Sequence, residues 1–191
     1  MATLSNNQLV TTLCKACIGV GVARGIAEDI SQALAKLGDN ELNKAIEELN
    51  LALKAYDPND KDLAKPQMID RGYMFPEARL LHHGPSIVEW ANAVGDGNEV
   101  ILVSIFDCPC CLEALVKFAE QPGQLLRTKA GLELDFSIDR LEYMPPGGFY
   151  VSRVELMQAE WDEILEYSRN TMVPSDASSQ ADAGAGDSDN D

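Results

Sequence analysis

The sequence predicts an α+β fold in which helices dominate the amino-terminal half. Between residues 6 and 55, apolar side chains recur at helical spacing in three consecutive stretches. A continuous β-branched run then covers residues 100–106, and shorter alternating runs follow it. We therefore expect three amphipathic helices packed with a small mixed sheet, a final carboxyl-terminal helix and a disordered acidic tail.

The first helix is expected over residues 6–19, because Ser5 is a favourable N-cap and apolar residues recur behind it. A second apolar stripe begins at Ile26 and stops at Gly38, which fits a glycine in the left-handed conformation just after a helix. The third helix is expected to end near Ala55, before a turn rich in Asp and Pro. These helices must bury their apolar stripes against one another.

The middle of the chain carries weaker signals. Residues 67–82 show no clear period, and Gly84 followed by Pro85 indicates the start of a short helix, with the proline in its first turn. The run over residues 100–106 is the expected central strand, since an uninterrupted apolar strand is typical of one covered on both faces. A helix is then expected over residues 112–119.

Two further strands and one helix are predicted near the carboxyl end. Residues 132–138 alternate as a half-buried strand, and residues 148–152 form another short strand. Ser152 followed by Glu155 is a capping-box pattern for a final helix, whose buried stripe would begin at Met157.

Length and composition indicate one domain. Of the 191 residues, 1–170 are expected to form a single globular domain, and 171–191 a flexible tail rich in Ser, Ala, Gly and Asp. The 46% hydrophobic and 24% charged residues are typical of a globular protein, so the fold does not require disulfides or metal.

The charge balance restricts the partners. A formal net charge of -16 repels nucleic acid and anionic lipid, so we expect neither. The chain has no apolar run of about 18 residues, and its first residues lack the pattern of an export signal, so we expect a cytoplasmic protein.

Both ends of the chain carry a family pattern. The start combines Lys15 and Ala16 with Gly19, Gly21 and a run from Gly25 to Glu28. The end combines Val-Pro-Ser, Gly-Ala-Gly and Asp-Asn-Asp in residues 173–191. On these residues the chain resembles an uncharacterised bacterial family, domain of unknown function 3726. It departs from that family at Met172 and Gln180, where Tyr and Arg are usual. The family has no assigned activity, so the resemblance implies no reaction.

The patterned tail favours a protein partner. Its proposed contact residues are Val173, Pro174, Ser175, Gly184, Gly186, Asp189 and Asp191. An extended tail of this length can enter the cleft of another subunit. The first functional hypothesis is therefore a non-catalytic accessory or small subunit of a larger cytoplasmic metabolic enzyme, and a homo-oligomer is a further possibility.

The reactive side chains that cluster in this chain are its five cysteines: Cys14, Cys17, Cys108, Cys110 and Cys111. A thiol cluster between a strand and a helix N-terminus favours the nucleophilic thiolate. The cysteines could also ligate zinc or an iron–sulfur cluster, although no cofactor is expected, or they could be buried thiols. The second functional hypothesis is therefore a metal-binding or redox and nucleophilic enzyme that uses Cys108, Cys110 and Cys111, with His82 or His83 as base.

The glycine-bracketed corner after the first helix is the remaining candidate site. Small residues there let two helices approach closely, and this packing role is the simpler explanation for Gly21 and Gly25. Lys15, Arg24 and Glu28 would flank the corner and could bind a small anionic ligand.

Overall fold

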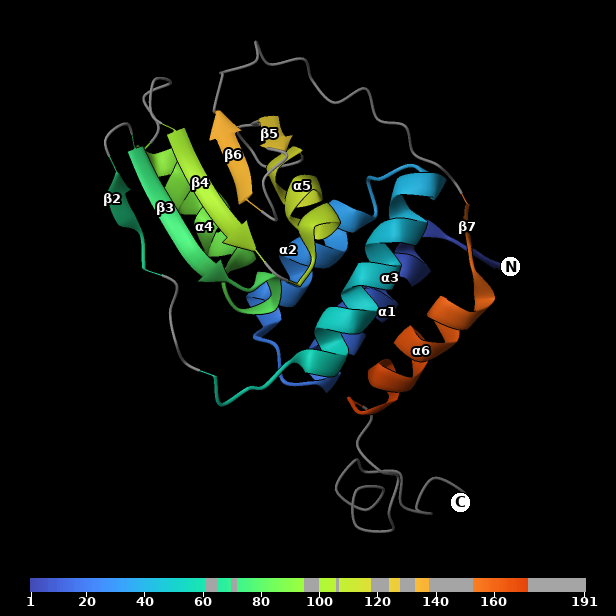
Figure 1. The fold of residues 1–191 in the computed structure, drawn as a ribbon. Coiled ribbons are helices and arrows are strands. Elements are labelled where there is room, and N and C mark those ends of the chain that lie inside the picture. The colour runs from blue at the N-terminus through green and yellow to red at the C-terminus, as the bar shows by residue number, and fades with distance from the viewer. Residues whose placement is uncertain are drawn as a thin grey trace, which may run out of the picture.

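The structure is a computed structural model, and it describes residues 1–60, 65–69, 72–94, 100–105, 107–117, 124–127, 133–137 and 153–171. The described chain has the expected α+β fold, with a mixed sheet and a helix at its carboxyl end (Figure 1). The expected strand at 148–152 and the tail residues 172–191 lie outside the described residues. Disorder of the tail therefore stays a prediction.

The helices are α1 (Asn6–Gly19), α2 (Arg24–Leu34), α3 (Asp39–Ala55), α4 (Leu80–Val94), α5 (Pro109–Lys117) and α6 (Gln158–Arg169). The strands are β1 (Ala2–Leu4), β2 (Gln67–Ile69), β3 (Gly72–Ala78), β4 (Val100–Ile105), β5 (Gln124–Arg127), β6 (Glu133–Ser137) and β7 (Val154–Leu156).

The three amino-terminal helices form where their apolar stripes predict. Ser5 caps α1 as expected: its hydroxyl accepts the backbone N–H of Gln8 at 3.2 Å, and the Gln8 side chain accepts the N–H of Ser5 at 3.0 Å. The prediction for Gly38 is wrong. It has φ -73° and precedes α3 as its N-cap, because α2 ends earlier, at Leu34. Among the described residues, the glycine with a positive φ is Gly21, at 100°, between α1 and α2.

The larger sheet has five strands in the order β2-β3-β4-β6-β5, so the predicted β4 is its central strand. β3 and β4 are parallel and the other pairs are antiparallel, which makes the sheet mixed. The sequence did not indicate β3. Its register with β4 shifts between Phe75 and Ala78, around Pro76, and a proline removes one donor of the ladder. This irregularity explains why the segment shows no period-two alternation.

Helix α4 begins at Leu80, so the prediction of a helix start at Gly84 and Pro85 is wrong and Pro85 lies inside the helix. Gly84 has a packing role instead. A Cβ on it would lie 2.8 Å from a methyl carbon of Leu80 and 3.1 Å from one of Leu115, so glycine allows α4 and α5 to pack closely.

The final helix also begins later than the capping-box pattern indicates. Glu155 belongs to β7, which pairs antiparallel with β1, and Met157 is the N-cap of α6. The first turn of α6 has no side-chain cap; instead, the side-chain oxygen of Asn43 on α3 accepts the N–H of Met157 itself at 2.9 Å. Met157 is 55% exposed, so the buried stripe of α6 begins at Trp161 instead.

α1, α3 and α6 lie on one side of the molecule, the five-stranded sheet with α4 behind it lies on the other, and α2 and α5 lie between them (Figure 1). Leu9, Leu13, Leu34, Ile46 and Leu49 are fully buried in the helical core. Within the described ranges, every helix is too short or too polar to cross a bilayer.

Candidate functional site

The cysteine-rich segment lies where the sequence places it, between the central strand and a helix. β4 ends at Ile105, and α5 begins at Pro109. The carbonyl of Cys108 accepts the N–H of Leu112 at 3.2 Å, which places Cys108 at the N-cap position. Pro109 suits the first helical position because its fixed φ is helical and no N–H is needed there. The helix therefore starts three residues earlier than predicted, and it contains Cys110 and Cys111.

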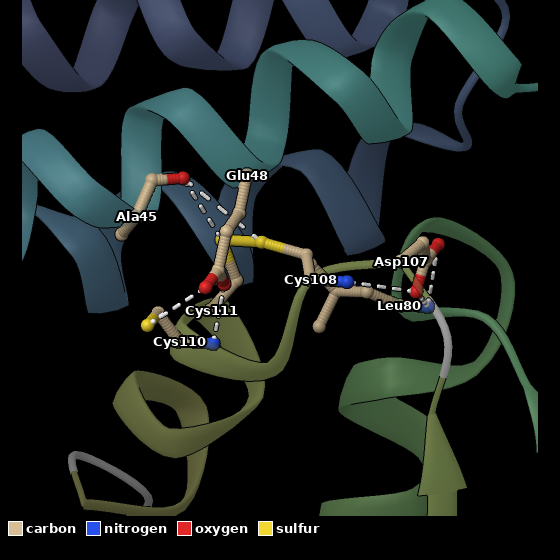
Figure 2. The surroundings of a disulfide bond; sticks show 7 residues. All are labelled: Ala45, Glu48, Leu80, Asp107, Cys108, Cys110 and Cys111. Carbon is tan, nitrogen blue, oxygen red and sulfur yellow. Dashed lines mark hydrogen bonds between the residues drawn. A yellow bond between two sulfur atoms is a disulfide. The ribbon is translucent and has the colours of Figure 1, made fainter. Parts of the chain in front are cut away.

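Cys108 and Cys111 form a disulfide, with their Cα atoms 5.4 Å apart (Figure 2). Both residues are buried, at 0% and 1% exposure. One turn of helix brings an N-cap residue and the third helical residue to the same side, and this spacing allows the two sulfurs to meet. The Cys-x-x-Cys pair at a helix N-terminus is the arrangement in which thiol pKa values are lowered in dithiol redox proteins.

Helix α3 supplies the wall against which this pair packs. The carbonyl oxygen of Ala45 lies 4.0 Å from the sulfur of Cys108 and 3.6 Å from that of Cys111. In the dithiol state the same oxygen can accept either S–H. The pair therefore has a polar neighbour despite its burial.

The third cysteine of the segment meets a different group of α3. The carboxylate of Glu48 accepts the backbone N–H of Cys110 at 2.7 Å and its thiol at 3.1 Å. Figure 2 shows Glu48 reaching from α3 to Cys110, while the carbonyl of Ala45 points at the disulfide. Cys110 is half-buried and is not part of the disulfide.

Asp107 links this segment to α4. Its carboxylate accepts the N–H of Leu80 at 2.9 Å and the N–H of Cys108 at 3.1 Å. Burial raises the pKa of this carboxyl, and the hydrogen bonds from Leu80 and Cys108 oppose that increase. The carboxylate stabilises the start of α4, because an anion is favoured at a helix N-terminus.

The cysteines of α1 are a separate pair. Cys17 is fully buried, and burial raises the pKa of its thiol to about 12. Burial also raises the pKa of Cys14, with a further increase from the Glu28 carboxylate. Both thiols are therefore poor nucleophiles in the folded protein.

The predicted five-cysteine metal site does not form in the part of the chain that the structure describes. There, no three or more His, Cys, Asp or Glu side chains are grouped so that they could hold a metal ion. Cys108 and Cys111 are also joined to each other, and a metal requires their thiolates.

At the corner between α1 and α2, one of the two basic side chains proposed to bind an anion is already paired with a carboxylate. Arg24 forms an ion pair with Glu28 at 2.7 Å, one helical turn away on α2, and Lys15 is exposed on α1. Apart from the neighbouring residues and backbone of its own helix, no described atom lies within 4 Å of where a Cβ of Gly25 would be, so the packing explanation for Gly25 is wrong. Anion binding by Lys15 and Arg24 stays a prediction.

Both histidines lie in the first turn of α4 and contact neighbouring residues. The ring of His82 stacks on that of Tyr56 with centroids 4.4 Å apart. His83 is 8% exposed, and its Nδ1 accepts the N–H of Arg79 at 3.2 Å. These contacts give both rings a packing role, and the side chain that accepts a hydrogen bond from the Cys110 thiol belongs to Glu48.

The sequence did not indicate Glu48 or Ala45 as part of the site. They lie three residues apart on α3, far from the cysteines in sequence, and Glu48 follows Glu47 in an ordinary helix pattern. Asp107 had a local signal, because an acidic residue just before a helix N-terminus is favourable.

Comparisons of the chain with models of protein families, with curated proteins and with solved structures give no match. The resemblance to a domain of unknown function stays a prediction. The tail residues proposed to bind a partner, from Val173 to Asp191, lie outside the described residues.

Proposed function

We propose that the protein is a thiol–disulfide redox protein whose exchanging pair is Cys108 and Cys111. The observation that carries this proposal is the position of the pair: a Cys-x-x-Cys disulfide at the N-terminus of α5, directly after the central strand β4. The reaction class is reversible exchange of two electrons and two protons with a dithiol or disulfide partner.

A purely structural role explains the disulfide less well. It joins residues only three apart, and the chain-entropy estimate for so small a loop is about 2 kcal/mol, compared with about 3 kcal/mol for a loop of about 15 residues. The helical core is also large enough to support the fold, with Leu9, Leu34 and Ile46 among its fully buried side chains. This disulfide therefore stabilises the fold less than one that closes a longer loop.

The electrostatics of the segment favour reversible exchange. The N-terminus of a helix carries partial positive charge, which stabilises the thiolate released when a disulfide is reduced. Cys108 at the N-cap and Cys111 in the first turn both lie within this field. Cys17 is buried to the same degree, but it lies near the carboxyl end of α1 and has no such stabilisation.

In the reduction of the disulfide, an external dithiol supplies the two electrons. One thiolate of the dithiol attacks a sulfur of the pair, the bond between Cys108 and Cys111 breaks, and the other cysteine leaves as a thiolate that takes up a proton. The second thiol of the reductant then attacks the mixed disulfide, releases the remaining cysteine and becomes part of an oxidised, cyclic disulfide. The reverse sequence oxidises the protein. Because both sulfurs are buried, this step requires local opening of the segment.

The test is a redox titration of the full chain in buffers of reduced and oxidised dithiothreitol, followed by acid quenching, alkylation and mass spectrometry. We expect one reversible two-electron transition that disappears in Cys108→Ser and in Cys111→Ser. Cys14→Ser, which changes a half-buried thiol outside the segment, is the matched control and should leave the midpoint unchanged. A pair that stays reduced, or stays oxidised, over the whole range would refute the proposal.

The hypothesis of an accessory subunit that binds through its tail is a separate proposal, independent of the redox pair. Its contact residues lie outside the described residues, so its support is the tail pattern alone.

A further inference from the structure

Three cysteines in four positions can pair in more than one way, yet the structure pairs Cys108 with Cys111 and leaves Cys110 as a thiol. Exposure does not explain this choice, because the half-buried Cys110 is the most accessible of the three. The most accessible thiol would be expected to react first. The helical spacing lets the sulfurs of Cys108 and Cys111 meet, but it does not keep Cys110 from reacting.

Helix α3 presents a different group to each kind of cysteine. Ala45 offers a neutral carbonyl oxygen to the sulfurs of Cys108 and Cys111, at 4.0 and 3.6 Å. Glu48, three residues later, offers a carboxylate to Cys110 at 3.1 Å from its sulfur. These two residues lie on the same side of α3 and sort the three sulfurs into two environments (Figure 2).

We propose that Glu48 determines which cysteines pair, by holding Cys110 as a neutral, hydrogen-bonded thiol. This inference rests on the proposed redox role of Cys108 and Cys111. Glu48 is then a specificity-determining residue: it excludes Cys110 from thiol–disulfide exchange, so that Cys108 forms its disulfide with Cys111.

The physical reason is charge. Attack on a disulfide requires a thiolate, and a thiolate at Cys110 would face the Glu48 carboxylate where the thiol now donates a hydrogen bond. The same carboxylate accepts the N–H of Cys110 at 2.7 Å, so it offsets the positive helix end at that position. The sulfurs of Cys108 and Cys111 face a neutral carbonyl and keep the favourable effect of the helix N-terminus.

Glu48→Gln separates this role from a merely structural one. Its amide oxygen can still accept the N–H of Cys110, but it carries no charge. Glu48→Ala removes both functions. Glu47→Gln is the matched control, because Glu47 is the exposed neighbour on α3 and the charge change is identical.

The first experiment maps pairing in the full chain. Protein oxidised with oxidised dithiothreitol is alkylated at its three remaining thiols and fragmented, and mass spectrometry identifies which of Cys108, Cys110 and Cys111 carries a label. Wild type and Glu47→Gln should carry the label on Cys110. Glu48→Gln and Glu48→Ala should raise the ratio of label on Cys108 or Cys111 to label on Cys110 by about fivefold or more. An unchanged ratio in Glu48→Gln would overturn the inference.

The second experiment uses fully reduced protein, so it does not depend on disulfide formation. The rate constant for alkylation of Cys110 by iodoacetamide, at fixed pH and salt, should rise about fivefold or more in Glu48→Gln and stay unchanged in Glu47→Gln. An equal rate in Glu48→Gln and wild type would refute the role of Glu48 even if the pair exchanges normally. A wild-type pair that never exchanges would refute the proposed function alone.

Discussion

The carboxylate of Asp107 accepts the backbone N–H of Leu80 at 2.9 Å, so the residue that leads into the cysteine pair also fixes the start of α4. The same carboxylate accepts the N–H of Cys108 at 3.1 Å. One side chain therefore joins the end of β4, the first turn of α4 and the N-cap of α5.

Replacing Asp107 should destabilise this junction. Asp107→Ala leaves the N–H groups of Leu80 and Cys108 without their acceptor, and a buried donor without a partner costs about 1–3 kcal/mol. Urea unfolding monitored by circular dichroism measures the loss. Asp162→Ala, which changes an exposed carboxylate on α6, is the control. An equal, small effect of both substitutions would contradict the capping role.

The pH dependence of Asp107→Asn tests the raised pKa of this carboxyl. A carboxyl whose folded pKa lies above its unfolded value of about 3.8 binds its proton more tightly in the native state. The free energy of unfolding of the wild type, minus that of Asp107→Asn, should therefore rise as the pH falls through the folded pKa, and level off below 3.8. A difference that shrinks with falling pH would mean that the hydrogen bonds outweigh burial.

Gly19 should tolerate no side chain. A Cβ there would overlap the carbonyl oxygen of Tyr167, so Gly19→Ala must push α6 away from α1. We expect thermal unfolding to show that the free energy of unfolding falls by about 1–3 kcal/mol, as at other overpacked sites. Gly25→Ala is the matched substitution. Gly25 lies in α2, and the described residues outside that helix leave open space for its Cβ. Gly25→Ala should therefore raise the free energy of unfolding by about 0.5–1 kcal/mol, because alanine reduces the backbone entropy of the unfolded chain. The reverse order of the two variants would contradict this packing.

The buried thiol of Cys17 should make the protein less stable as the pH rises above 9. Its thiol has a pKa of about 12 in the folded protein and 9.0 as its ordinary value, so the unfolded chain loses this proton first. The contribution is complete below pH 9 and falls as the pH rises toward 12, by at most about 4 kcal/mol at 1.36 kcal/mol per unit. Urea unfolding between pH 8 and about 10.5 should show a shallower decline for Cys17→Ala than for wild type. Parallel declines would argue against burial of this thiol.

Deletion of residues 172–191 tests the proposed tail contact. The described helices and strands end before this segment, so the truncated chain should keep the unfolding temperature of the full chain. If the tail is the interaction segment, affinity capture with the full chain recovers a defined partner that the truncated chain fails to retain. Equal recovery by both chains would remove the basis for a tail-mediated partner. A substitution of Val173, Pro174 and Ser175 by Gly keeps the length and tests the pattern itself.

Local patterns in the sequence were sufficient for the elements whose signals are contained within one segment. The apolar stripe of α1 and the β-branched run of β4 predicted both ends of their elements within about two residues, and the stripe of α3 predicted its end at Ala55, because burial of one face imposes a fixed period. The capping box at Ser5 was predicted in part, since the N-cap is a local property. The position of the cysteine segment, after a strand and at a helix start, followed from the same patterns.

Where a distant side chain completes an element, the tertiary structure alone decided the outcome. Asp107 supplies an acceptor for the first N–H of α4, and Asn43 supplies one at the start of α6, so both helices begin away from their predicted caps. Glu48 and Ala45 meet the cysteines only because α3 packs on α5. The sequence by itself determined which segments carry apolar faces and where the thiols concentrate. The packing of those faces determined which thiol meets a carboxylate and which meet a carbonyl, because such contacts join residues about 60 positions apart that no local period can relate.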